Sequence, residues 1–444
     1  MLLFPNGESQ PGELGHLHAG ARTALSGSPE GGWYNPAGLA RETATTVTVG
    51  VDLAQYQRAS VGRSSAASAA PGSTYFAVAT GSGRKRNASR LAYGLFVHWP
   101  LNRDIRVRQR RSEAVGASEV PSAVDPGGLD IFGDGIEKTV SSTGRGRMSV
   151  LSTGASVGFE LRRWWRIGVG LHWERVQFME SSTRFTTFGA EGGTSDDATY
   201  RGTVQEASRY EGQLDRIVPV FGTQFDFGPA VTFGITVRFP SSDVGGSGAF
   251  ELTRSSRSTF QVGDSPVTSL DDSIVAEGHG LNFDLRTPLE VRYGLGVAAA
   301  GSAFEIDVIQ TEGVPSYTVL PLSPAEPPSS AAFLPPPYRT RLRPRFRVAM
   351  GAAITLRDDL STIFGLRTDS SGNTGRDAVF RRIDLFTFTW GLVHTDGPLS
   401  GSLGISYQVG SAKVAFPSPL GEERDKRNTQ YELLGIRLAV TVLL

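Results

Sequence analysis

The sequence predicts an all-β protein, a transmembrane antiparallel β-barrel of about 14 strands. Three observations support this fold class. Long segments alternate apolar with mixed side chains, short and long connections alternate along the chain, and the C-terminal segment has one wholly apolar face. Because successive side chains of a strand point to opposite faces, such segments suit a wall between lipid and a wet lumen.

The C-terminal segment, YELLGIRLAVTVLL, shows the pattern most clearly. One face carries Leu434, Ile436 and Leu438, and the other carries Gly435 and Arg437. A soluble sandwich would bury the apolar face, whereas a membrane barrel would expose it to lipid and turn Arg437 toward the lumen. The segment lengths favour the barrel, because a tilted membrane strand needs about 9–11 residues.

Alternation defines fourteen predicted strands. They span 43–58, 73–80, 89–99, 147–160, 164–180, 213–227, 229–253, 289–299, 302–312, 343–356, 359–368, 383–395, 398–414 and 429–444. Short connections at 81–88, 161–163, 228, 300–301, 357–358 and 396–397 alternate with long ones at 59–72, 100–146, 181–212, 254–288, 313–342, 369–382 and 415–428. Bacterial outer-membrane barrels have such short periplasmic turns and long external loops. We interpret Leu281–Leu285 as an extra strand or as an extension of the strand at 289.

The composition excludes several function classes. The 44 basic and 44 acidic residues balance, which argues against a nucleic-acid partner. Cysteine is absent, so disulfides and thiolate chemistry are excluded. No apolar run reaches the roughly 18 residues of a membrane helix. The start, MLLFPNGESQ, lacks the basic region of a signal peptide, so we expect a mature or truncated chain, or a misassigned start codon.

The sequence predicts no enzyme, no cofactor and no metal site. Its six histidines are scattered without the spacing of metal ligands. His172 and Glu174 share the presumed lumen face of one strand, but no nucleophile signature accompanies them. We interpret both as parts of a polar lumen wall.

The first 42 residues do not alternate, and they contain the run Asn35-Pro36-Ala37-Gly38. This run, which follows a stretch of small residues at 20–27, resembles the N-terminal segment of the long-chain fatty-acid transporter (FadL/TodX-like) family of outer-membrane proteins. Segments at 217–240, 346–369 and 401–414 are also similar to that family. The resemblance therefore extends from about residue 15 to the C-terminus.

The resemblance implies an N-terminal hatch, residues 1–42, inside the lumen of a barrel formed by residues 43–444. Asn35, Pro36, Ala37 and Gly38 would form the centre of the hatch. The implied function is uptake of hydrophobic small molecules, long-chain fatty acids or hydrocarbons, across the bacterial outer membrane by passive, hatch-gated diffusion. The implied protein is a monomer whose partners are this ligand, outer-membrane lipid or lipopolysaccharide, and the barrel-assembly machinery. An adaptor barrel for secreted or surface proteins and a porin-like pore are the alternatives.

Four arginines are candidate ligand-binding residues. Arg238, Arg292, Arg347 and Arg437 lie on the non-apolar faces of their strands. Since a guanidinium group binds a carboxylate through a bidentate fork, we predict that at least one of them meets a ligand carboxylate. Interstrand salt bridges with Glu290 or Asp384 are the alternative interpretation.

Overall fold

The computed structural model describes residues 15, 17–27, 29–61, 64–69, 72, 74–81, 90–127, 129–192, 197–321, 338–370, 384–415 and 426–444. Residues 1–14, 16 and 28 of the predicted hatch lie outside this set, as do most of the connections 81–88, 369–382 and 415–428 and part of 313–342. No helix in the described ranges is long and apolar enough to cross a membrane.

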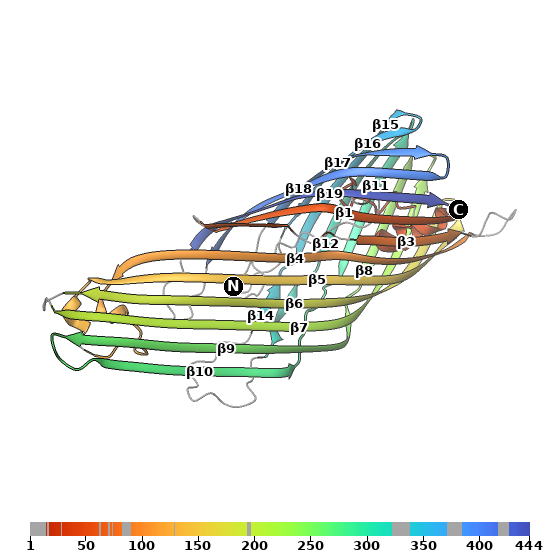
Figure 1. Ribbon diagram of the computed structural model, residues 1–444. Coiled ribbons are helices and arrows are strands. Elements are labelled where there is room, and N and C mark those ends of the chain that lie inside the picture. The colour runs from red at the N-terminus through yellow and green to blue at the C-terminus, as the bar shows by residue number, and fades with distance from the viewer. Residues whose placement is uncertain are drawn as a thin grey trace.

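Fourteen antiparallel strands close into a barrel (Figure 1). In order around the wall they are β1 (Thr45–Val61), β3 (Thr74–Gly81), β4 (Leu91–Val115), β5 (Ile136–Arg162), β6 (Trp165–Glu191), β7 (Ala198–Phe227), β8 (Val231–Arg238), β11 (Glu290–Ala299), β12 (Ser302–Thr311), β15 (Arg345–Arg357), β16 (Leu360–Asp369), β17 (Asp384–Asp396), β18 (Leu399–Ala415) and β19 (Lys426–Leu443). The ring closes where β19 pairs with β1, with Val440 opposite Val49. Each predicted strand overlaps one barrel strand, so the predicted fold class is confirmed.

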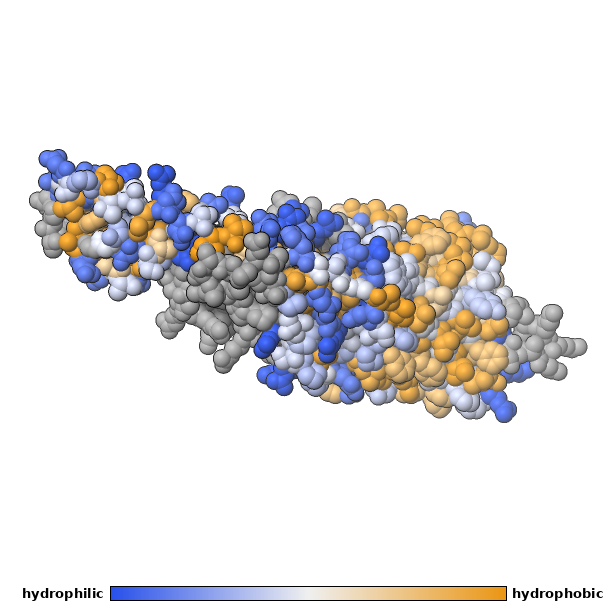
Figure 2. Space-filling model, turned by 90° about the horizontal axis from the view of Figure 1, so that it is seen from below, coloured by the Kyte–Doolittle hydropathy of each residue, from blue (hydrophilic) through white to orange (hydrophobic). Residues whose placement is uncertain are grey.

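The outward face of the barrel is apolar, as the alternation predicted. On β19, Ile436 is 37% exposed and Leu438 is 39% exposed, whereas Arg437 between them is 3% exposed. Figure 2 shows hydrophobic residues gathered over the barrel end of the molecule and hydrophilic residues gathered toward the other end. A belt of this kind is what a barrel presents to lipid.

One predicted strand, 229–253, is wrong because it is two strands. β8 ends at Arg238, and β9 (Ser242–Val262) starts after Pro240. β9 pairs with residues 198–217 of β7 and does not continue the barrel wall. Proline lacks a backbone N–H and cannot continue a central strand, so the break falls there.

The long connections predicted at 100–146, 181–212 and 254–288 are also wrong, because most of their residues are in strands. The far parts of β4–β7, together with β9 and β10 (Thr268–Leu281), form a sheet that projects well beyond the barrel (Figure 1). We call this sheet the extension. Leu281 is the last residue of β10 and residues 282–289 form no strand, so neither interpretation of 281–285 was right.

The tip of the extension has its own small core. The segment between β4 and β5, which contains the short helices η2 (Ala117–Glu119) and η3 (Leu129–Phe132), packs its apolar side chains on the sheet. Tyr200 of β7 is buried there and donates a hydrogen bond to the Val124 carbonyl at 3.0 Å. The remaining strands are β2 (Ser64–Ala69), which pairs with β1 in the predicted connection 59–72, and the hairpin of β13 (Val314–Leu320) and β14 (Tyr338–Leu342).

Candidate functional site: the barrel lumen and the segment inside it

The N-terminal segment from Leu17 to Arg41 packs against the inner wall of the barrel. It includes a short helix, α2 (Gly31–Tyr34), and a 3-10 helix, η1 (Pro36–Arg41). Its described residues are almost all buried. Segments this short gain little stability alone, so contacts with the wall determine their position.

Asn35 joins this segment to itself and to the wall. Its side-chain oxygen accepts the backbone N–H of Ala37 at 3.1 Å and so caps η1. Its amide nitrogen donates to the carbonyl oxygens of Thr23 at 2.8 Å, Thr223 of β7 at 3.1 Å and Ile235 of β8 at 3.4 Å. Asn35 therefore holds a turn and also fixes that turn to two barrel strands.

Pro36 and Gly38 each suit their positions in the N-terminal segment for a different reason. Pro36 begins η1, where its missing N–H has no cost. A side chain at position 38 would overlap the carbonyl of Ser26 in the facing part of the same segment. Gly38 therefore allows the two halves of the segment to touch.

Glycines of the inner wall make room for the N-terminal segment. A side chain at Gly168 of β6 would overlap the Pro36 backbone, and one at Gly222 of β7 would overlap the Asn35 amide. The glycines that approach the segment in this way are Gly94, Gly158, Gly168, Gly222, Gly234, Gly294, Gly296, Gly351, Gly365, Gly391 and Gly404. They come from strands around most of the barrel, so the lumen is shaped to this segment.

Two carboxylates of β12 hold the backbone at 22–25. Asp307 accepts the backbone N–H groups of Arg22 and Thr23, both at 3.1 Å, and the Thr23 hydroxyl at 2.6 Å. Glu305 accepts the N–H groups of Ala24 at 2.5 Å and of the next residue at 3.2 Å. Together the two carboxyl groups accept five hydrogen bonds from the segment, so this pair is a main anchor of the segment.

Gln224 of β7 holds the carbonyl groups of the same loop. Its amide nitrogen donates to the carbonyl of Ala24 at 2.9 Å and to that of Ser26 at 3.2 Å. The loop is therefore bound through its N–H groups by β12 and through its carbonyl groups by β7. Sequence reasoning missed Gln224 and both carboxylates, although Glu305 and Asp307 occupy alternate positions in an otherwise apolar strand.

An aromatic cluster adjoins α2. The ring of Trp33 stacks on His172, with centroids 5.4 Å apart and an interplanar angle of 11°, and Phe96 meets Trp33 edge-on at 5.5 Å. The Arg238 guanidinium lies 4.7 Å from the centre of the Trp33 ring. The buried Tyr75 hydroxyl has no hydrogen-bond partner among the described residues. Trp33, Phe96 and Tyr75 are all buried, so the cluster packs the lumen beside η1.

All four predicted arginines face the interior, and each forms an ion pair with a barrel carboxylate. Arg238 pairs with Glu174 at 2.9 Å, and Arg437 pairs with Asp52 at 2.5 Å. Glu290 accepts both Arg292, at 2.7 Å, and Arg347. Asp384 is not among these partners.

These pairs extend into a ladder of charges along the wall. Arg216 also binds Glu174, at 2.7 Å, and Asp369 lies between Arg347 at 3.4 Å and Arg367 at 3.3 Å. The ladder contains five guanidinium groups, of Arg216, Arg238, Arg292, Arg347 and Arg367, and three carboxylates, of Glu174, Glu290 and Asp369.

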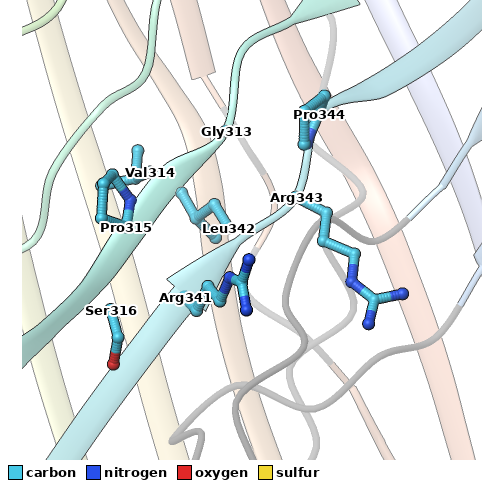
Figure 3. Close-up of a pocket in the computed structure, with 8 residues that line it drawn as sticks. All are labelled: Gly313, Val314, Pro315, Ser316, Arg341, Leu342, Arg343 and Pro344. Carbon is cyan, nitrogen blue, oxygen red and sulfur yellow. The ribbon is translucent and has the colours of Figure 1, made fainter.

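The β13–β14 hairpin carries a separate cavity of about 330 Å³ (Figure 3). Its lining is Gly313, Val314, Pro315, Ser316, Arg341, Leu342, Arg343 and Pro344. Nearby, Tyr317 accepts the backbone N–H of Arg286 at 3.1 Å, and burial raises the pKa of Tyr317 to about 12, so its hydroxyl stays protonated near neutral pH. Residues 313–342 were predicted only as a long connection, so neither this hairpin nor its cavity was predicted from the sequence.

These features together define a transmembrane β-barrel with its own N-terminal segment packed in the lumen. The fold is similar to that of a Pseudomonas aeruginosa FadL homologue, with a TM-score of 0.59 and 11% sequence identity over 99% of each chain. It is also similar to the toluene transporter TodX of P. putida, with a TM-score of 0.52 and 12% identity over 98% of this chain and 99% of TodX. No protein-family model matches the sequence, and no curated protein is detectably similar to it in sequence.

Proposed function

We propose that this protein is an outer-membrane channel through which hydrophobic small molecules diffuse passively, with residues 1–42 as the hatch and residues 43–444 as the barrel. The main support is the N-terminal segment that packs in the lumen through hydrogen bonds and close contacts. Contacts of this kind can break and re-form, so such a segment can gate a path without covalent change.

The lumen supports an amphiphilic or aromatic ligand. The cluster around Trp33 suits an apolar body, and the ladder of arginines suits a carboxylate. The fatty-acid and hydrocarbon classes implied by the N-terminal resemblance match these two surfaces. The cavity of the β13–β14 hairpin, which combines apolar residues with Arg341 and Arg343, would be a first contact for such a molecule outside the barrel.

Uptake in a host that lacks its own hydrophobic-compound channels tests this function. Cells that express the chain should take up a labelled long-chain fatty acid or toluene faster than cells with an empty vector, and the rate should scale with the external concentration. Uptake no faster than in the vector control, for both compounds, would overturn the channel assignment.

Replacing one of the four predicted lumen arginines should weaken the binding of fatty acids selectively. For single Ala variants of Arg238, Arg292, Arg347 and Arg437, we expect at least one to lose roughly tenfold in affinity for a fatty acid, because a charge-assisted hydrogen bond contributes about 1.5–3 kcal/mol. The methyl ester of the same acid should bind each variant as it binds the parent chain. The exposed Arg209→Ala is the matched control, and unchanged binding in all four variants would dismiss the idea.

The adaptor role is the second candidate. The extension favours it, because a sheet that projects far beyond the barrel is not needed for a path through the membrane (Figure 1).

A further inference from the structure

The outermost strand of the extension, β10, has one free edge. Among the described strands it pairs only with β9, from Thr268 opposite Phe260 to Leu281 opposite Gly248. It lies at the margin of the projecting sheet (Figure 1). An edge strand presents a row of unpaired N–H and C=O groups, so another extended chain can pair with it.

β10 lacks several of the features that commonly protect an edge. Its sequence, TSLDDSIVAEGHGL, contains no Lys and no Pro, and its register shift comes only at its end, between Gly278 and Leu281. Natural edges are commonly protected by Lys, Pro or bulges. The residues from 268 to 273 are all exposed, and Val275 is 56% exposed.

The charges on β10 disfavour a second copy of the same strand. In the antiparallel register that pairs all of β10 with another β10, Asp272 would lie opposite Glu277 twice. In a parallel, in-register pair, each of the acidic residues would lie opposite itself. Like charges directly opposite one another destabilise a strand pair, so β10 is protected against self-association.

The same charges favour a basic partner. Ala276 and Gly278 are buried on the inner face, so Asp271, Ser273, Val275 and Glu277 share the outer face. Glu277 also lies opposite another acid, Glu251, on the paired strand β9. A cation on a partner strand would offset the repulsion between these two carboxylates. An antiparallel partner that matched the outer face would carry Lys or Arg at both ends and an apolar residue beside Val275.

We propose that the free edge of β10 is a docking site for an extended, basic segment of another protein, which adds as a strand to the extension. Every second residue of the partner faces outward, and these residues should be, in order, a basic, an apolar, a small polar and a basic residue. The free edge provides main-chain hydrogen bonds, and Asp271 and Glu277 select the basic segment. This role is separate from passage through the lumen.

The test uses the full-length protein in detergent and a labelled peptide with the core KTVTTTK. The peptide should bind, and its counterpart with Glu in place of both Lys should not. In two further peptides, every second backbone amide is N-methylated. One peptide has the methyl groups along one edge of the strand, and the other has them along the opposite edge. Strand addition requires one of them to fail and the other to bind, whereas simple charge attraction would let both bind equally.

Variants of the protein locate the site. Asp271→Lys combined with Glu277→Lys should weaken binding roughly tenfold and allow the acidic peptide to bind, since each cross-strand charge pair changes sign. Because the chain has no cysteine, Ser273→Cys gives a single thiol for disulfide trapping of a peptide with Cys in place of its fifth residue, the Thr opposite Ser273. Arg209→Ala with Glu211→Ala, on β7, is the control. Equal binding of both methylated peptides, no effect of the charge reversal, or dimerisation through β10 would overturn the proposal.

Discussion

A chain that lacks residues 1–42 is expected to fold as a barrel and to conduct small ions freely. The ring is closed by β1 and β19, and β1 begins at Thr45, so the deletion removes no barrel strand. In the truncated chain, the wall glycines that touch the segment in the full chain would line an open lumen. A barrel of fourteen strands is close in size to the barrels of about 16–18 strands that hold a water-filled channel. In planar bilayers the full chain should be almost closed, whereas the truncated chain should show the steady conductance of an open pore.

The same truncated chain should lose selectivity for hydrophobic compounds. Trp33 and the rest of α2 disappear with the segment, and with them the aromatic cluster. Leakage of small hydrophilic solutes into cells should therefore rise, while uptake of a fatty acid should no longer exceed the leak. Circular dichroism that still shows a folded β protein is the control. Conductance equal to that of the full chain would mean that the segment is not a plug, and would favour the adaptor role.

The barrel was predictable because the membrane imposes a simple rule on its strands. Lipid on one side and a polar interior on the other produce the alternation of Leu434, Ile436 and Leu438 with Arg437, and that pattern depends only on neighbours in the chain. The extension was not predictable in this way. It lies outside the apolar belt, and stretches such as 181–191 and 198–212 contain only a few apolar side chains among many polar ones, so they looked like loops.

The candidate site was predictable only in part. The resemblance identified Asn35, but its wall partner Thr223 is 188 residues away in the sequence, and no local pattern pairs them. The arginines were located on the inner face by alternation, and Glu290 was named as a possible partner, yet Arg238 pairs with Glu174 of another strand. Glu305 and Asp307 did leave a signal, since two acids alternate with Phe304, Ile306 and Val308 in β12.

Those two carboxylates lead to the second prediction: Glu305→Gln and Asp307→Asn should loosen the N-terminal segment and leave the barrel folded. Both substitutions preserve side-chain shape but replace one acceptor oxygen of each residue with an NH2 donor, which cannot accept the N–H groups of residues 22–25. Since each hydrogen bond contributes a net of about 0.5–1.5 kcal/mol, the loss of two should make the double variant open roughly 30-fold more often.

Two measurements report on this loosening. Hydrogen exchange should speed up at the amides of Ala24 and Leu25, which Glu305 now holds, while exchange in the paired amides of β18 and β19 stays slow. Single-channel recordings should show brief openings whose frequency rises from the single to the double variant. Glu312→Gln, at an exposed position just past β12, is the matched control. If exchange and openings in the double variant equal those of the control, the carboxylates do not hold the segment, and its anchorage must come from Gln224, Asn35 and the close packing on the wall glycines.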